Sequence, residues 1–178
     1  MRDAHRLLRD ATREAHERLD AQFAGFDLAT RDGYAGFIGA QASAMMAVEA
    51  ALDAAGAERV IDDWPARRRS DALRRDAAAL GIEPHPLDPP ALAGEAAIAG
   101  ALYVVEGSRH GARFLRRQVA DGLPTAFLDA DQAPGSWPKL LDRIDPILYQ
   151  PEAEEAAIRS ALDIFDLFAT AGRVWMKA

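Results

Sequence analysis

The chain has 178 residues and no cysteine, and this absence excludes several kinds of protein at once. There can be no disulfide framework, no cysteine-based zinc or iron–sulfur site, and no thiol nucleophile. A bound metal or a cofactor iron would need histidine, carboxylate or tyrosine as its ligand. Only four histidines are present, so few imidazoles are candidates.

Positive charge and long apolar runs are also scarce. The 21 Lys and Arg against 28 Asp and Glu give a net charge of −7, which argues against broad nucleic-acid binding. No uninterrupted run of about 18 apolar residues occurs, so no membrane span is expected. The first 16 residues mix acids with bases and lack an apolar core, unlike a signal peptide. We expect a cytoplasmic protein without a nucleic-acid or membrane partner.

Proline is absent from three long blocks, residues 1–64, 91–123 and 152–178. Because proline costs about 3 kcal/mol inside a helix, these Ala-rich blocks are where long helices can form. No stretch shows the period-two alternation typical of strands. At roughly 100–200 residues per domain, the composition predicts one compact all-α, multi-helix domain over residues 1–178.

The helix boundaries are predicted from caps, glycines and prolines. Thr30 is expected to cap the second long helix, which Gly56 ends, and Gly81 ends the third. The proline-rich segment 82–90 should be an extended linker. The expected helices cover residues 3–20, 31–55, 65–80, 91–121, 137–148 and 151–175, with a short segment at 57–63.

His16 is the histidine with the most informative surroundings. It follows the helical spacing of an apolar stripe that includes Leu8 and Leu19, so a half-buried core histidine is one interpretation. The other is a ligand presented into a pocket. Arg9 and Arg13 flank the same side of the helix, either as a solvated face or as anchors. One neutral imidazole with two cations suits a planar metal cofactor that carries carboxylate arms.

Residues 99–117 consist mostly of residues that favour a helix, interrupted by Gly100, Gly107 and Gly111. Each glycine costs about 0.5–1 kcal/mol relative to alanine, so a reason for it is expected. Gly107 and Gly111 lie one turn apart on one face. They favour either close packing of another helix or direct contact between the helix backbone and a flat ligand.

A concentrated basic stretch lies in the same segment. No acid occurs between residues 107 and 120, and we call residues 109–117, with their four arginines, the basic strip. It is either a solvated helix face, an anion-facing rim, or a docking patch for an acidic redox partner.

Two segments together resemble the heme oxygenase family. LRDATREAH, residues 8–16, is similar to the proximal helix of that family, whose histidine ligates heme iron. EGSRHGARFL, residues 106–115, resembles its distal helix, where a glycine-rich kink lies over the heme; the EGS opening is closest to the bacterial, phytochrome-associated type. KLLDR, residues 139–143, is similar to a late helix that supplies a Lys and an Arg to the heme edge.

The resemblance implies a heme oxygenase-like fold and an enzyme that opens heme to biliverdin, iron and carbon monoxide with O₂. Heme would be both substrate and cofactor, electrons would come from an external ferredoxin or reductase, and a bacteriophytochrome is a possible recipient of the biliverdin. His16 would ligate the iron, and Gly107, Ser108 and Gly111 would form the catalytic distal face. The residues implied to hold the heme are Arg9, Arg13, His16, Ala112, Lys139 and Arg143.

Three distal residues depart from the family pattern. Ala112 stands where a second glycine is usual, and Ser108 stands where mammalian members carry an Asp that orders water. His110 is expected to point away from the heme, although a second axial ligand there would block oxygen. These departures leave open a heme-binding protein of the same fold that does not degrade heme. A non-heme helical relative, such as the thiaminase-like group, and a helical interaction module without a small-molecule site are also compatible with the sequence.

Overall fold

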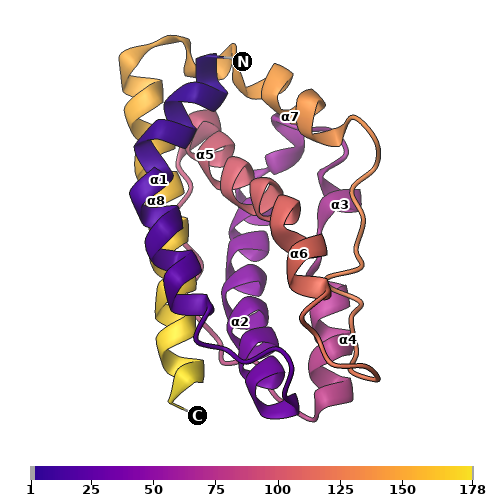
Figure 1. The fold of residues 1–178 in the computed structure, drawn as a ribbon. Coiled ribbons are helices and arrows are strands. Elements are labelled where there is room, and N and C mark those ends of the chain that lie inside the picture. The colour runs from indigo at the N-terminus through magenta and orange to yellow at the C-terminus, as the bar shows by residue number, and fades with distance from the viewer. Residues whose placement is uncertain (1–2, 178) are drawn as a thin grey trace.

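The computed structural model describes residues 3–177, and every regular element within that range is helical (Figure 1). The predicted all-α class is therefore confirmed. The α-helices are α1 (Asp3–Phe23), α2 (Arg31–Ala55), α3 (Trp64–Arg67), α4 (Ser70–Leu80), α5 (Gly94–Gly107), α6 (Ala112–Arg116), α7 (Ser136–Ile144) and α8 (Pro151–Met176). Short 3₁₀ turns are η1 (Ala57–Arg59), η2 (Ser108–Gly111) and η3 (Ile147–Tyr149).

The core forms where α2, α5 and α8 meet. α8 packs against α1, α2 and α5, while α4 covers another side of α2 (Figure 1). By length and composition alone, α2 is apolar enough to cross a membrane, the one such helix in residues 3–177. Most of α2 is buried inside the bundle, as in the core helix of a soluble protein. Its apolar composition therefore follows from its place in the core.

The predicted ends of α2 and α4 are confirmed. The Thr30 hydroxyl accepts a hydrogen bond from the Gly33 backbone N–H at 3.1 Å, which satisfies one of the unpaired donors of the first turn. Gly56 and Gly81 adopt φ of +77° and +73°, the left-handed conformation that only glycine enters readily. These local signals act within a few residues, and for that reason the sequence alone could place them.

The helix predicted over residues 65–80 is wrong, because the structure divides it into α3 and α4. The carboxylate of Glu49, on α2, accepts the backbone N–H of Arg69 at 2.6 Å and that of Ser70 at 3.1 Å. These groups are the first donors of α4, which lack partners within their own helix. A side chain 20 residues away in sequence therefore starts a new helix there.

The single helix predicted over residues 91–121 is also wrong. α5 ends at Gly107, the chain continues through η2, and α6 stops at Arg116. The Val105 carbonyl, near the end of α5, accepts hydrogen bonds from the side chains of Arg69 and Ser108. Side-chain donors thus cap the helix end where the backbone ladder is interrupted. Residues 137–148, likewise, form α7 and η3 rather than one helix.

Candidate functional site

His16 stands on the surface of α1 and not in the core. Its side chain is 61% exposed, whereas Thr12 and Ala15 beside it are buried. The core-histidine interpretation is therefore wrong, and the imidazole lies at the margin of the apolar stripe. Its Nδ1 lies 3.3 Å from a carboxylate oxygen of Asp20, and its ring meets Phe165 of α8 edge-on at 6.0 Å between centroids. A carboxylate at Nδ1 leaves the Nε2 lone pair available to a ligand.

Gly107 and Gly111 differ from Gly100 in what surrounds them. A Cβ at Gly100 would collide with the backbone carbonyl of Ala157, so close packing of α5 on α8 requires glycine there. A Cβ at Gly107 would meet only the Trp137 ring, at 3.5 Å, and one at Gly111 would meet nothing within 4 Å. The helix-packing interpretation holds for Gly100 alone. Gly111 leaves a bare stretch of backbone, and we call residues 107–112 the glycine turn.

α1 and α5 both begin toward the same end of the bundle, and α5 runs obliquely to α1 (Figure 1). The two helices meet where the His5 ring of α1 lies 6.0 Å from the Tyr103 ring of α5, and the charge of Arg9 acts on the tyrosine pKa. His16 and Gly111 each lie further along the chain from this contact. α1 packs mainly on α8. A flat ligand between α1 and the glycine turn would therefore have an imidazole on one face and bare backbone on the other.

Tyr103 lies on the same face of α5, one turn before Gly107, although no sequence motif singles it out. Its ring centroid lies 6.0 Å from that of His5 on α1. Burial, followed by the opposing effects of Arg9 and Asp10, raises the pKa of Tyr103 to about 12. The hydroxyl therefore stays protonated at neutral pH and can donate a hydrogen bond. In the sequence, the position of Tyr103 four residues before Gly107 already places both residues on one helix face.

The four predicted cations occupy two different settings. Arg9 is exposed and bonds only its neighbour Asp10, at 2.9 Å, and Arg13 is exposed without an ion pair in residues 3–177. The Lys139 ammonium lies 2.7 Å from Asp62 and 3.3 Å from Asp63. The hydrogen bond to Asp62 raises the pKa of Lys139, desolvation opposes it, and Asp63 adds to the rise. Arg143 is exposed on the same helix, α7.

A buried cluster of charges lies beneath the glycine turn, and no local sequence pattern predicts it. Glu106 is 1% exposed and accepts hydrogen bonds from Arg67 at 2.9 Å, Arg109 at 3.2 Å and Gln132 at 2.7 Å. Arg109 is thus buried, which removes it from the exposed basic strip predicted from the sequence. The strip that remains exposed lies on and after α6.

Arg69 is the member of this cluster that touches the turn itself. Burial first, and then the neighbouring charge of Arg109, lowers the pKa of Arg69 to about 10, so it stays a cation at neutral pH. It donates to the Ser108 hydroxyl at 2.9 Å, and that hydroxyl donates to the Val105 carbonyl at 2.7 Å. The hydroxyl proton of Ser108 is therefore already used, and only one of its lone pairs remains for a water molecule.

The remaining two distal residues lie as follows. Ala112, at the start of α6, is half-buried. His110 is exposed, and its ring packs edge-on against Trp137 with 4.8 Å between centroids. The expectation that His110 points away from the heme stays a prediction.

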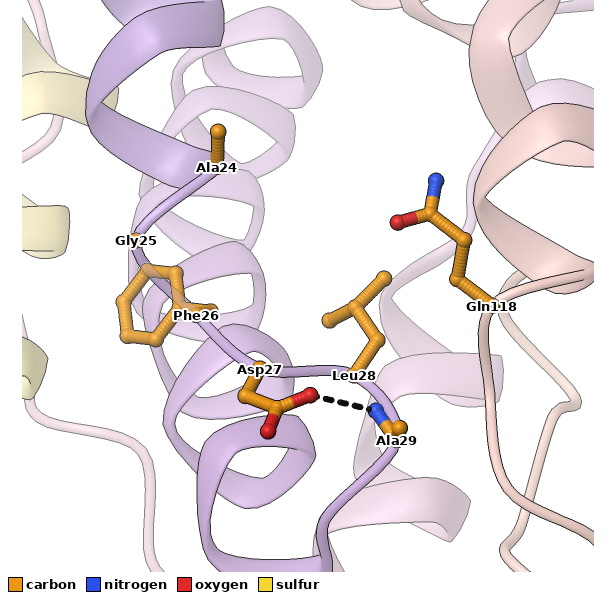
Figure 2. Close-up of a pocket in the computed structure, with 7 residues that line it drawn as sticks. All are labelled: Ala24, Gly25, Phe26, Asp27, Leu28, Ala29 and Gln118. Carbon is orange, nitrogen blue, oxygen red and sulfur yellow. Dashed lines mark hydrogen bonds between the residues drawn. The ribbon is translucent and has the colours of Figure 1, made fainter.

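A cavity of about 490 Å³ opens between the turn that follows α1 and the residue Gln118 after α6 (Figure 2). Leu28 and Gln118 approach each other across it, and the Asp27 carboxylate bonds the Ala29 N–H (Figure 2). Its volume is typical of small-molecule sites. None of the predicted site residues lines it. No group of three or more potential metal ligands occurs in residues 3–177.

Fold and geometry define an all-α protein whose candidate site holds a flat ligand between one histidine and a bare helix turn. No protein-family model matches the chain. A heme oxygenase from Xanthomonas campestris is 36% identical over 113 residues, which cover 60% of this chain and 68% of that protein. The heme oxygenase PigA of Pseudomonas aeruginosa is 30% identical over 172 residues, covering 88% and 85%. The chain belongs to the heme oxygenase family.

Solved structures agree on the fold. The NO- and CO-bound heme oxygenase of Neisseria meningitidis superposes with a TM-score of 0.83 at 23% identity, over 99% of this chain and 93% of that one. The heme oxygenase of Leptospira interrogans gives 0.73 at 16% identity, over 95% and 98%. The family, the fold and the heme-degrading enzyme class predicted from the sequence are confirmed. The individual site residues stay predictions.

Proposed function

We propose that this chain cleaves heme to biliverdin, iron and carbon monoxide at a site between α1 and the glycine turn, with O₂ and external electrons. The observation that carries the proposal is the exposed imidazole of His16 on α1 together with the uncovered backbone of Gly111 in η2. When bound, heme supplies the iron that activates oxygen. The iron would take its ligand from the protein at His16.

On the proximal side, His16 would bind the iron through Nε2. Asp20, 3.3 Å from Nδ1, would hold the ring in the tautomer that keeps Nε2 unprotonated. Because the imidazole is exposed, the substrate can reach Nε2 without displacing core residues.

On the distal side, Gly107, Ser108, Gly111 and Ala112 would form the catalytic face. The bare backbone at Gly111 allows the turn to lie close to the substrate, which limits where oxygen can point. The free lone pair of Ser108 would accept a hydrogen bond from a water molecule, and that water would supply the proton. Ser108 itself would act as an acceptor, since its own proton bonds the Val105 carbonyl.

The substrate carboxylates would be held first by Arg9 and Arg13 on α1. Arg13 has no competing ion pair in the described range, and the protonated hydroxyl of Tyr103 lies near Arg9 as a further donor. Lys139 and Arg143 would assist from α7. Lys139 would first have to release Asp62 and Asp63, so we assign it a smaller contribution.

External electrons would come from a ferredoxin or reductase with an acidic surface, and the enzyme would be cytoplasmic. Arg113 and Arg117 are exposed on and after α6 around Phe114, whose exposure is 67%, and Arg116 pairs with Asp129 at 3.1 Å. Arginine and exposed aromatics are enriched where proteins dock, and the sign suits an acidic partner. A bacteriophytochrome would be a possible acceptor of the biliverdin.

Titration of the purified protein with hemin tests the proposal. We expect a Soret band, and its loss with the appearance of biliverdin absorbance once reductant and air are supplied. A Soret band that persists under those conditions would support heme binding without degradation, and no band would support a non-heme protein. His16→Ala should alter the axial-ligand spectrum, whereas the matched variant His110→Ala should not. The reverse result would assign the iron to His110.

A further inference from the structure

We propose that Trp137 is a substrate-positioning residue: its indole forms a side wall of the site and selects which meso carbon of the heme is opened. This inference rests on the proposed function. It concerns a residue of α7 to which neither the sequence patterns nor the proposed heme contacts assign a role.

The first observation is the unequal cover over the two glycines of the turn. Gly107 and Gly111 lie one turn apart on the same face. A Cβ at Gly107 would lie 3.5 Å from Cη2 and 3.8 Å from Cζ3 of Trp137, whereas a Cβ at Gly111 would meet nothing within 4 Å. A flat ligand can therefore lie against Gly111, but toward Gly107 its edge meets the six-membered ring of the indole.

The second observation is the way in which the indole is held. The His5 ring from α1 packs against it at right angles at 5.7 Å, and the His110 ring from η2 does so at 4.8 Å. Tyr103 from α5 completes the cluster at 5.5 Å. Rings from both facing helices thus fix the position of Trp137, and edge-to-face contacts of this kind favour one orientation. The wall is therefore tied to the same two helices that hold the substrate.

The third observation is that the wall is accessible. Trp137 is half-buried, so part of its surface is open to solvent. Its six-membered ring lies directly beside the glycine turn, 3.5 Å from a Cβ built at Gly107. A large half-exposed aromatic surface next to a ligand site is typical of a contact residue.

The consequence follows from the shape of heme. A nearly square, flat molecule can be seated in several in-plane orientations, and its carboxylate anchors alone leave it room to shift sideways. A wall on the α7 side fixes that shift. Displacements of about 1 Å strongly change which atoms lie in reactive geometry. The position of the wall should therefore decide the proportion of biliverdin isomers.

The test compares wild type, Trp137→Ala, Trp137→Phe and His110→Ala, with Tyr149→Ala as a control because Tyr149 is 80% exposed and outside the cluster. Each protein is loaded with hemin and turned over with a chemical reductant, and the isomers are separated by chromatography. Independently of turnover, proton NMR of the ferric cyanide complex counts the in-plane seatings through the heme methyl signals.

We expect Trp137→Ala to change the isomer ratio by at least about threefold and to add a second set of methyl signals. Trp137→Phe and His110→Ala should shift both readouts less and in the same direction, and Tyr149→Ala should match wild type. If Trp137→Ala fails to fold, as circular dichroism would show, the other two variants decide. If Trp137→Ala still binds heme and leaves the isomer ratio and the methyl signals unchanged, the role assigned to Trp137 is wrong and the proposed function still stands. Absence of a Soret band in wild type would overturn the proposed function and the wall with it.

Discussion

The two sides of the site are held in opposite ways. On α1, His16 and Arg9 are exposed, and their polar partners Asp20 and Asp10 are close in sequence on the same helix. The glycine turn rests on a buried charge cluster that joins it to α3 and the start of α4. In the proposed function, this difference suits the two roles: a single metal ligand would tolerate a weakly constrained helix, since the bond itself would orient the ring. A face that directs oxygen would need a rigid support to keep its geometry.

Among the proposed substitutions, removal of the Glu106 charge should cause the largest loss of folding stability. Glu106→Gln leaves the buried cations Arg67 and Arg109 short of an acceptor, and breaking a buried ion pair in this way costs about 3–5 kcal/mol. Urea unfolding measures the loss. Arg9→Ala, on the exposed side, should change the unfolding free energy by no more than about 0.5 kcal/mol. Equal losses in the two variants would remove the contrast between the sides.

Alanine substitutions at Gly100 and Gly111 test the same contrast through the space available for a methyl group. Gly100→Ala would force a methyl against the Ala157 carbonyl, and overpacking of this kind costs about 1–3 kcal/mol. Gly111→Ala has open space and φ of −85°, so it should leave stability unchanged or raise it by about 0.4–1 kcal/mol. Of the two variants in their folded form, only Gly111→Ala should bind hemin more weakly than wild type does. Hemin titration measures this difference. Full hemin affinity in Gly111→Ala would contradict the placement of the substrate at the turn.

The sequence predicts the parts of the molecule whose causes are local. Thr30 and Gly56 mark the ends of α2 through contacts within a few residues. The candidate site residues come from the resemblance of two short segments to heme oxygenases, since helical spacing alone leaves other interpretations open. The division of α3 from α4 could not be predicted, since Glu49 caps α4 from 20 residues away. Arg109 likewise reads as a surface cation beside Arg113, and only the tertiary position of Glu106 explains why it is buried.

The stability of the protein should depend on pH through Asp76, which holds the loop that contains Ala126 and Phe127. Asp76 is buried and accepts the N–H groups of Ala126 and Phe127 at 2.9 Å each, and Phe127 lies under the Arg69 guanidinium. Burial raises the pKa of Asp76 despite these bonds. The folded protein therefore binds the proton at a higher pH than the unfolded chain does. The contribution of Asp76 to stability should increase as pH falls from above its folded pKa toward 3.8, the unfolded value.

Asp76→Asn provides the measurement for this pH dependence. The amide nitrogen cannot accept one of the two backbone N–H groups, so the variant should lose about 1–3 kcal/mol at neutral pH. Because Asn does not titrate, the difference from wild type should widen as pH falls toward 3.8 and stay constant at high pH. Urea unfolding over a pH series records both. A difference that narrows on acidification would mean that the Asp76 pKa is not raised.

The smallest effect is expected on the exposed side, at Asp20. Its carboxylate is 69% exposed and solvent screens its contact with His16, so Asp20→Asn should change stability by less than about 0.5 kcal/mol. Its influence on the ligand nitrogen is more direct, because a carboxylate that accepts the Nδ1 proton makes Nε2 a stronger donor. We expect hemin affinity to fall by no more than about tenfold, the lower end of such effects. Glu14→Gln, on the same helix and paired only with Arg18 at 3.8 Å, is the control and should bind hemin as wild type does. A larger loss of stability in Asp20→Asn than in Asp76→Asn would mean that α1 is as firmly constrained as the glycine turn, and the separate roles assigned to the two sides would have to be abandoned.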